Sequence, residues 1–489
     1  MRTLTDQEEV RREKMEVLRK KGINPFGSKF DITSDSKKIK EEYENFSKEE
    51  LDDVKPEVIV AGRIMSKRRS GKAGFMHIQD KYGQIQIYIS INSVGDEDYE
   101  LYKAADLGDI IGINGYVCRT NTGELSIHAT KYTHLVKALR PLPEKFHGIA
   151  DPEIKLRKRY LDIIMDEEVK ELFYKKQKFW STIRNLLIEE GFLEVETPVL
   201  EITSGGAAAT PFKTHHNALD VDVYLRIAMG ELWQKKLLVA GYEKTFEIGR
   251  QFRNEGMSPE HLQDYTQMEF YWAFADFKDG MNLVQDMYRK VTKAVLGSSK
   301  FTSKCYEVDM DNEWEIYDFE TIIKEKTNID IYNSNKEEII KYLETTNQQF
   351  DSKVPYWRLV DVLWKTIRRK LSGPGFLIGQ PVELNPLPKR LETDPRKVAQ
   401  FQVIIAGSEM GNGYSELNDP LDLEERFLEQ RTMAESGDEE AHVHDKEFVE
   451  ALEYGMPPAV GFGVSERFFA VLVDRPIREC VIFPLMKSK

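Results

Sequence analysis

Cysteine is scarce in this sequence of 489 residues, and long apolar runs are missing from it. The three cysteines, Cys118, Cys305 and Cys480, are far apart and odd in number, which excludes a disulfide framework and the paired spacing of a zinc site. Residues 1–21 are crowded with charge and lack the apolar core of a signal peptide. No apolar stretch approaches the ~20 residues that a membrane-spanning helix requires. These absences predict a cytoplasmic protein with reduced thiols.

Positive charge is also in deficit, since 69 Lys and Arg residues face 83 Asp and Glu residues and give a net charge of −14. An acidic chain is by itself a poor partner for nucleic acid. The deficit is uneven, because residues 1–150 hold 25 basic and 24 acidic residues, whereas the remainder holds 44 and 59. Residues 1–150 therefore repel a polyanion such as nucleic acid less than the rest of the chain does. Hydrophobic residues make up 41% of the sequence, which is enough for packed cores throughout.

Five short segments with the alternating apolar pattern of strands follow one another in the first part of the chain. Turn residues such as Gly83 and Gly123 separate neighbouring segments. The number and spacing of the strands are typical of a small closed barrel of the OB type. We expect an OB-fold domain at residues 57–140, after an N-terminal helical segment at residues 1–56. The predicted strands lie at residues 58–64, 74–78, 84–89, 110–117 and 124–129.

Within the N-terminal segment, residues 1–24 are predicted to be helical and residues 31–56, rich in Lys, Glu and Asp, to be a solvated connection. Residues 141–157 contain prolines and a His-Gly pair and indicate a linker to a domain at residues 158–489. A long helix is expected from about residue 167 to residue 190, where Gly191 ends it. Beyond it, helices and strands mix without the regular alternation of a doubly wound sheet, so the fold class is α+β.

Two stretches of the second part place an arginine where it suits phosphate binding. Residues 246–255 form a strand pattern that runs into a loop opened by Arg253, and a guanidinium can bind a phosphate and a carboxylate together. Residues 461–470 place small residues ahead of Arg467, at the predicted start of an apolar helix. Each stretch alone also fits a structural role, as a surface ion-pair cluster or as a glycine-rich turn before a core helix.

Two further stretches combine carboxylates, glycine and proline. Residues 408–419 place glycines near Glu409 and Glu416, and such carboxylates can hold Mg²⁺ or bind a cationic substrate. Residues 191–198 are a helix stop followed by an extended segment that Pro198 fixes. Read alone, the first stretch is also an acidic loop and the second a structural boundary.

Together and in this order, the stretches resemble the class II aminoacyl-tRNA synthetases. Residues 192–198 are similar to motif 1 of that class, residues 246–255 to motif 2 and residues 461–467 to motif 3. The predicted barrel places the chain beside the lysyl, aspartyl and asparaginyl enzymes, and the resemblance to the lysyl-tRNA synthetase family runs over nearly the whole chain. The segments that carry it include residues 137–148, 159–162, 205–209, 215–220, 224–228 and 414–419.

The resemblance implies a catalytic domain with an antiparallel β-sheet flanked by helices. It implies that the carboxylate of L-lysine attacks the α-phosphate of ATP and expels pyrophosphate, and that the terminal adenosine of tRNA(Lys) then takes the lysyl group. It further implies Mg²⁺ as cofactor and a homodimer whose interface includes the long helix before motif 1.

The resemblance also implies roles for single residues. Arg253 and Arg467 are the expected catalytic residues, which bind the phosphates of ATP. The ATP site is completed by Glu255, His261, Tyr265 and Glu409, of which Glu409 is the expected metal ligand. The expected lysine pocket consists of Gly206, Glu231, Glu269, Tyr271, Asn412, Tyr414 and Glu416.

In the barrel, the resemblance implies that Phe75, Gln86 and Glu124 read the anticodon. An aromatic ring stacks on an unpaired base, while polar groups read the edge of the base. The expected phosphate contacts are Lys67, Arg68, Arg69 and Lys72.

The chain departs from the family pattern at several places. Gln402 stands where a second carboxylate ligand of Mg²⁺ is usual, and Glu466 replaces the usual Asp before the motif 3 arginine. Thr210 replaces a common basic residue, and one extra residue sits near residues 229–230. Residues 258–265 differ from the usual bacterial motif 2 loop. The resemblance therefore predicts the roles of residues least well at the metal site and in the motif 2 loop.

Three alternative functions are open for such a sequence. An aspartyl or asparaginyl synthetase would offer a cation to its substrate's side chain, whereas Glu269 and Glu416 offer carboxylates. A synthetase-like enzyme that lysylates a protein would lack the anticodon barrel. A synthetase-derived nucleic-acid-binding protein without activity would not need both Arg253 and Arg467.

Overall fold

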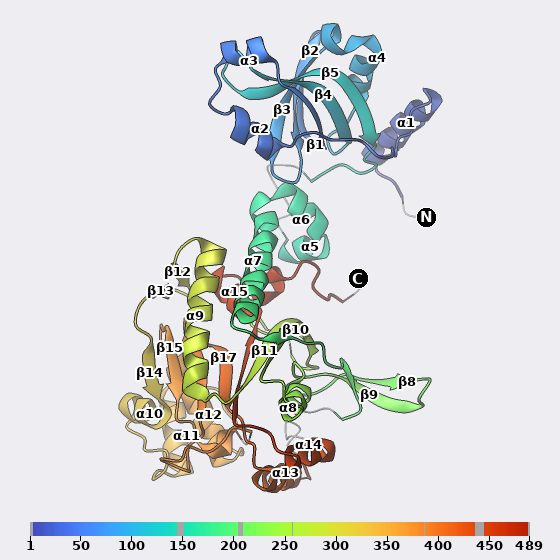
Figure 1. Ribbon diagram of the computed structural model, residues 1–489. Coiled ribbons are helices and arrows are strands. Elements are labelled where there is room, and N and C mark those ends of the chain that lie inside the picture. Colours follow the sequence, from blue (N-terminus) through green and yellow to red (C-terminus); the bar gives the residue numbers. More distant parts are fainter. Residues whose placement is uncertain are drawn as a thin grey trace. The chain divides into compact units, whose positions relative to one another are not determined.

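The computed structural model describes residues 3–143, 151–203, 209–256, 258–385, 387–435 and 445–487. The chain forms two compact units, Met1–Glu167 and Glu168–Lys489 (Figure 1). Within the described ranges, no helix combines the length and the apolar character that a membrane crossing requires.

The first unit is built on a closed five-stranded barrel with the strand order β1-β2-β3-β5-β4. Side chains alternate across each strand, so that residues such as Ile64, Ile87 and Ile113 point inward and are fully buried. The predicted barrel and its five strands are confirmed. The strands are β1 (Glu57–Ser70), β2 (Ala73–Gln79), β3 (Gln84–Ser90), β4 (Ile110–Arg119) and β5 (Leu125–Val136).

The expectation of a solvated connection at residues 31–56 was wrong. Two short helices, α2 (Ser36–Tyr43) and α3 (Lys48–Val54), occupy this segment. Each buries one aliphatic side chain completely, Ile39 in α2 and Leu51 in α3, within the barrel core. A single buried aliphatic residue in each charged helix leaves almost no apolar periodicity to detect.

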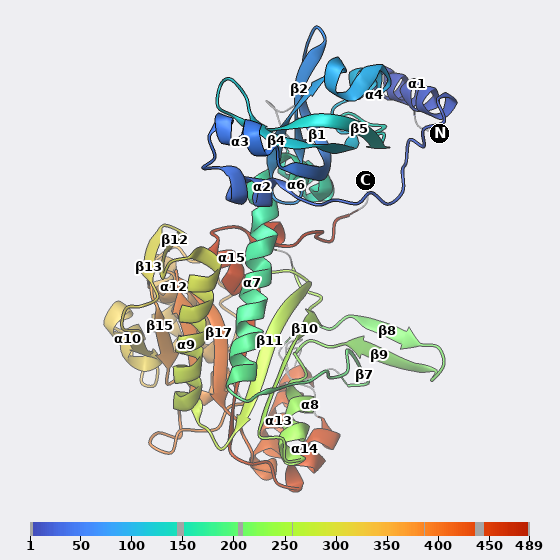
Figure 2. The ribbon, with the colours of Figure 1, turned by 45° about the horizontal axis from the view of Figure 1, so that its top comes forward.

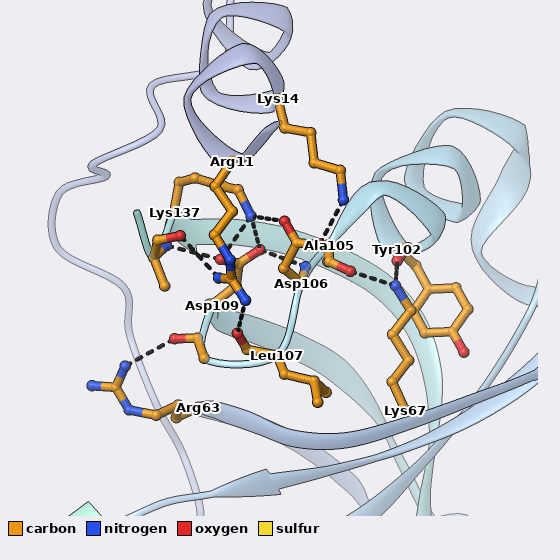
Figure 3. A network of polar contacts seen from close by, with 12 residues as sticks. Arg11, Lys14, Arg63, Lys67, Tyr102, Ala105, Asp106, Leu107, Asp109 and Lys137 are labelled. Carbon is orange, nitrogen blue, oxygen red and sulfur yellow. Dashed lines mark hydrogen bonds and ion pairs between the residues drawn. The ribbon is translucent and has the colours of Figure 1, made fainter. Parts of the chain in front are cut away.

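Two more helices belong to the barrel unit. They are α1 (Asp6–Lys20), as predicted, and α4 (Ile91–Ala104), which occupies the longer stretch of sequence between the third and fourth strands. A polar network fastens α1 to the barrel (Figure 3). Arg11 of α1 donates to the carbonyl oxygens of Leu107 and Ala138, at 2.9 and 3.0 Å. The buried ammonium of Lys137 lies 2.8 Å from Asp109, so this buried carboxylate has a partner.

The segment after the barrel was predicted to be a linker. Residues 144–150 lie outside the described residues. Residues from Pro152 onward form two short helices, α5 (Pro152–Arg157) and α6 (Arg159–Met165).

The second unit is built on an eight-stranded sheet with the order β14-β15-β16-β17-β18-β11-β10-β6. Its central strands are antiparallel, as expected, and the outer pairs β14–β15 and β10–β6 are parallel. The strands are β6 (Leu193–Glu194), β10 (Lys244–Phe252), β11 (Asp264–Ala273), β14 (Glu315–Asp318), β15 (Gly375–Ile378), β16 (Gln400–Ile405), β17 (Ser408–Ser415) and β18 (Ala459–Ser465).

Two long helices, α7 (Glu167–Glu189) and α9 (Phe277–Leu296), lie along one face of this sheet (Figures 1 and 2). Buried side chains of both, Phe179 and Val284 among them, share one core with Phe270 and Phe462 of the sheet. The predicted long helix is confirmed as α7. This packing leaves the opposite face of β11, β17 and β18 for a site.

The remaining elements surround the sheet. The helices α10 (Phe319–Thr327), α11 (Lys336–Thr345) and α12 (Tyr356–Arg368) form a separate small core with β14 and β15. A three-stranded sheet has the order β7-β9-β8, and β12 pairs with β13 in a hairpin. The other elements are β7 (Leu200–Glu201), β8 (Lys213–His216), β9 (Val221–Leu225), α8 (Glu231–Val239), β12 (Lys300–Ser303), β13 (Tyr306–Asp309), α13 (Pro420–Glu435), α14 (Lys446–Glu453) and α15 (Arg467–Leu472).

Candidate functional site

A cavity of about 470 Å³ opens on the sheet face opposite α9. Because side chains alternate along β18, Val460 and Phe462 pack into the core beneath α9, whereas Gly461 and Gly463 face the cavity. The predicted glycine-rich stretch is thus a strand and not a turn.

The cavity gathers the predicted catalytic, ATP-site and lysine-site residues from four separate stretches of the chain. Gly206 lies outside the described residues. All the others line the cavity: Glu231, Arg253, Glu255, His261, Tyr265, Glu269, Tyr271, Glu409, Asn412, Tyr414, Glu416 and Arg467.

Position 461 requires glycine because the side chains of Glu416 and Tyr271 approach its backbone closely. A Cβ atom there would lie 2.2 Å from Oε1 of Glu416 and 2.7 Å from the ring of Tyr271. No side chain fits in that space, so the glycine lets two functional side chains from neighbouring strands meet over the backbone.

Three buried carboxylates, those of Glu231, Glu269 and Glu416, lie at one end of the cavity, each less than 8% exposed. The carboxylate of Glu269 accepts three hydrogen bonds. They come from the amide of Met229 at 3.2 Å, from the side chain of Gln267 at 2.6 Å and from the Tyr271 hydroxyl at 3.0 Å. Gly230, near which the family resemblance implies one extra residue, has a left-handed backbone where α8 begins.

Among the described residues, one cation pairs with these carboxylates, and the sequence did not single it out. The ammonium of Lys235 lies 2.7 Å from Glu231 and 2.7 Å from Glu416, and it is almost fully buried. The Tyr414 hydroxyl also donates to Glu231, at 2.8 Å. The i, i+4 spacing of Glu231 and Lys235 is a signal in the sequence that could have pointed to this pair.

The acidic end of the cavity has more negative charge than Lys235 balances. Burial, with the nearby charge of Glu231, raises the pKa of Glu269 to about 7. Burial outweighs the attraction of Lys235 and raises the pKa of Glu416 to about 8. Neither oxygen of Glu416 receives a well-angled hydrogen bond from the described residues. This end of the cavity is therefore suited to a further ammonium group.

The two arginines come from two different parts of the chain, the end of β10 and the start of α15. Arg253 follows β10 directly, and its Nε donates to the carbonyl of Ile227 at 3.2 Å. Arg467 begins α15, and its guanidinium pairs with Glu260. Tyr265 and His261 line the same cavity.

The replacement of Asp by Glu466 has a structural explanation. Glu466 is fully buried, accepts from the amide of Thr266 at 3.1 Å, and pairs with Lys176 of α7. Its longer side chain thus ties motif 3 to both β11 and α7.

The expected metal position has two oxygen donors. Glu409 pairs with Arg368 at 2.5 Å and accepts from the Trp364 indole at 3.1 Å. The side-chain oxygen of Gln402 is buried without a partner among the described residues, and Gln402 lines the same cavity. These donors fit an ion such as Mg²⁺, which uses few protein oxygens and takes its other ligands from water and substrate phosphates. No cluster of three His, Cys, Asp or Glu residues suited to a metal was found in the described ranges.

On the barrel, the three predicted anticodon residues lie on one face made by β2, β3 and the start of β5. The Gln86 amide donates to Glu124 at 2.7 Å, and the other oxygen of Glu124 lies 3.1 Å from His77. Phe75 is 37% exposed, and its ring centre lies 5.2 Å from that of Tyr88. His77 and Tyr88 were not predicted, although strand alternation places both on this face.

Lys67 differs from its expected role as a phosphate contact. Its ammonium donates to the carbonyl oxygens of Tyr102 and Ala105, each at 2.6 Å, at the C-terminal end of α4 (Figure 3). Burial lowers the pKa of Lys67 to about 8. The group is committed to the end of a helix, where a cation is stabilising. The other predicted contacts, Arg68, Arg69 and Lys72, are exposed.

Comparison with known proteins agrees with this geometry. Residues 151–487 match the family described as tRNA synthetases class II (D, K and N), and residues 58–135 match the OB-fold nucleic acid binding domain. A lysine–tRNA ligase of Staphylococcus epidermidis is 44% identical over 492 residues, which cover 99% of each chain. Lysine–tRNA ligases of Bacillus cereus and Bacillus anthracis are 45% identical over 490 residues, 99% of this chain and 98% of theirs. The chain therefore belongs to the class II tRNA synthetases, in the family of the lysine–tRNA ligases.

Proposed function

We propose that this chain is an ATP-dependent lysine–tRNA ligase, which activates L-lysine as lysyl-adenylate and transfers the lysyl group to tRNA(Lys). The observation that carries the proposal is the acidic end of the cavity, where three buried carboxylates face one protein ammonium. Buried carboxylates without enough counter-charge are costly, and a ligand with two ammonium groups removes that cost.

In the proposed complex, Glu269 and Glu416 bind the side-chain ammonium of lysine and Tyr271 lies beside them. Glu231 binds the α-amine, together with Gly206 of the segment outside the described residues. Asn412 and Tyr414 line the pocket, and the substrate carboxylate points toward Arg253. The support for this orientation is that Arg253 lines the same cavity as the three carboxylates.

For ATP, we assign Tyr265 to stacking on adenine, and Glu255 and His261 to positions near the adenine and the phosphates. Arg253 binds the α-phosphate and the lysine carboxylate together, and Arg467 binds the terminal phosphates. A lysine carboxylate oxygen forms a bond to the α-phosphorus while the bond to the pyrophosphate oxygen breaks. No protein group forms a covalent bond, so catalysis consists of alignment and charge neutralisation.

Mg²⁺ is assigned to Glu409, with Gln402 as a second, neutral donor. When bound there, the ion would neutralise charge on the ATP phosphates. Arg368 pairs with Glu409 in the structure. We expect Arg368 to keep that carboxylate oriented both with and without bound Mg²⁺.

For tRNA(Lys), we assign Phe75, Gln86 and Glu124 to the anticodon. The pairing of Gln86 with Glu124 presents amide and carboxylate groups beside an exposed aromatic ring. A base stacked on Phe75 would place its edge against these polar groups.

We also propose a homodimer that uses α7 and the segment that follows it. Large apolar side chains are exposed there, which is typical of a surface that a partner covers. They are Tyr174, Ile188, Leu193, Val199, Leu200 and Ile202. The free cysteines support a location in the cytoplasm, where thiols stay reduced.

The alternatives are not favoured. An aspartate side chain would need a free cation at the acidic end, and Lys235 is already paired with both Glu231 and Glu416. A protein without activity would have no use for the arginines and carboxylates in one cavity.

The test is ATP–pyrophosphate exchange with each of the twenty amino acids. We expect exchange with lysine and not with aspartate or asparagine. Arg253→Ala should abolish the exchange while the fold, followed by circular dichroism, stays intact. Exchange with aspartate alone, or with no amino acid, would overturn the proposal.

A further inference from the structure

The motif 2 loop is the part of the sequence that the proposed function leaves unexplained. Its divergent segment forms a tight turn in which the backbones of Ser258 and His261 bond to each other at 3.3 Å. The Ser258 hydroxyl also lies 2.7 Å from the ring of His261. This turn presents Glu260 to the wall of the cavity.

The carboxylate of Glu260 lies between two cations. One oxygen pairs with Arg467 and the other with Lys304. Partial burial raises the pKa of Glu260, but the charges of Arg467 and Lys304 outweigh this effect and lower that pKa to about 2. Glu260 is therefore a permanent anion at this position.

Lys304 is placed by its own hairpin. It occupies the turn between β12 and β13, where Lys304 and Cys305 both have left-handed backbones, with φ of 49° and 71°. The amide of Lys304 donates to Asp474 at 3.0 Å, which fixes the turn. Its ammonium also lies 2.7 Å from the hydroxyl of Ser408, at the start of the strand that carries Glu409. From this defined backbone the side chain thus reaches Glu260, which lines the cavity.

The two cations exceed the charge of the anion between them. Arg467 and Lys304 each hold a different oxygen of one carboxylate, and a phosphate group presents the same two-oxygen edge with more charge. The buried Nε of Arg467 has no hydrogen-bond partner among the described residues, so this guanidinium has a donor left for another anion. All three side chains are partly exposed, at 20% to 37%, so solvent weakens the existing pairs and a more highly charged ligand can replace Glu260.

We propose that Lys304 is a further binding residue for the terminal phosphates of ATP and for pyrophosphate, and that Glu260 occupies the Lys304–Arg467 pair until those phosphates displace it. This inference rests on the proposed function, because it takes the phosphate role of Arg467 from there. It gives the divergent motif 2 loop a role: its carboxylate holds two phosphate-binding cations in position while the site is empty.

The first test compares Lys304→Gln with Lys304→Arg in the full-length protein. Losing one charged hydrogen bond should raise the KM for ATP and the KM for pyrophosphate in the exchange reaction by roughly 10-fold or more. The KM for lysine should stay unchanged, and Lys304→Arg should restore most of the loss. Lys300→Gln, on the same hairpin but 76% exposed, is the matched control and should change nothing.

Unchanged KM values for ATP and pyrophosphate in Lys304→Gln would overturn the proposal. An equal rise in the KM for lysine would also overturn it, because it would indicate a structural role. If Lys304→Gln does not fold, the KM values of Lys304→Arg and the second test still decide whether the proposal holds.

The second test removes the internal anion with Glu260→Gln. Binding of pyrophosphate, followed by isothermal titration calorimetry, should tighten by a few-fold, since the competing charge is gone. Weaker binding would mean that Glu260 is needed by the ligand, which contradicts its role as a placeholder. Calorimetry needs no amino acid activation, so this result stands apart from the proposed function, which the exchange screen tests.

Discussion

At the scale of single residues, the cavity is organised by unbalanced charge. Glu231, Glu269 and Glu416 are buried together, and Lys235 is their one counter-ion within the part of the chain that the structure describes. Two of these carboxyls have a raised pKa, which means that the empty site keeps protons where we expect the substrate ammonium to lie. Protons and lysine therefore compete for the same oxygens.

This competition predicts a pH dependence. The pKa of Glu269 is raised to about 7 and that of Glu416 to about 8, so both carboxyls lose protons as the pH rises from about 6 to about 8. The ionised forms bind the ammonium, and lysine itself stays protonated there, so the KM for lysine should fall about 10-fold or more over this range. ATP–pyrophosphate exchange assays at a fixed ATP concentration measure the KM for lysine at each pH.

The KM for ATP, measured in the same series, serves as the control and should change much less. Glu416→Gln should remove the upper part of the pH profile and weaken lysine binding at every pH. A KM for lysine that is flat or that rises with pH would contradict the assigned pocket.

The sequence pointed to most lysine-site and ATP-site residues, but only through the resemblance. Composition and periodicity gave no reason to prefer Glu269 over any other glutamate. The ion pairs of Lys235 and Glu260 were missed, because residues from distant segments meet only in the folded sheet. Lys67 was misjudged for the same reason: a basic run near the barrel surface is typical of a phosphate contact, but α4 places three carbonyl oxygens around this ammonium.

At the scale of elements, strand alternation and helix length were predicted well. The five barrel strands and α7 follow from periodic apolar residues and from stop signals such as Gly191. The helices α2 and α3 were not predicted, because each buries a single aliphatic residue amid charge. The parallel edge pairs of the large sheet also could not be predicted, since they join strands far apart in the chain.

The apolar surface of α7 and the next strands carries a prediction on assembly. Ile188→Asp places a charge where we expect the partner to bury an aliphatic side chain, so the dimer should weaken by about 10²-fold or more. Light scattering coupled to size exclusion measures the mass. Leu421→Asp, at a more exposed residue of α13, is the matched control and should stay dimeric. A wild-type chain that elutes as a monomer would refute the expected dimer.

At the scale of the whole molecule, we propose that the two compact units have different functions: the barrel unit binds the anticodon and the sheet unit activates the amino acid. The barrel unit has few excess charges and an aromatic, polar face, and the sheet unit holds the cavity. Amino acid activation needs only the cavity, whereas charging of tRNA needs both units. The two reactions should therefore separate in variants of the barrel.

Phe75→Ala is the variant that separates them. Loss of one stacked base costs about 1–3 kcal/mol, so the KM for tRNA(Lys) should rise about 5- to 150-fold. ATP–pyrophosphate exchange should stay at the wild-type rate. Equal losses in both assays would show that Phe75 supports the fold instead of binding the anticodon.

The most direct measurement of the central claim is charging of a mixed tRNA pool by the purified protein with radiolabelled lysine, aspartate or asparagine. We predict an alkali-labile aminoacyl ester with lysine alone, and only on tRNA(Lys). An ester with aspartate or asparagine, or none with lysine despite intact folding, would contradict it.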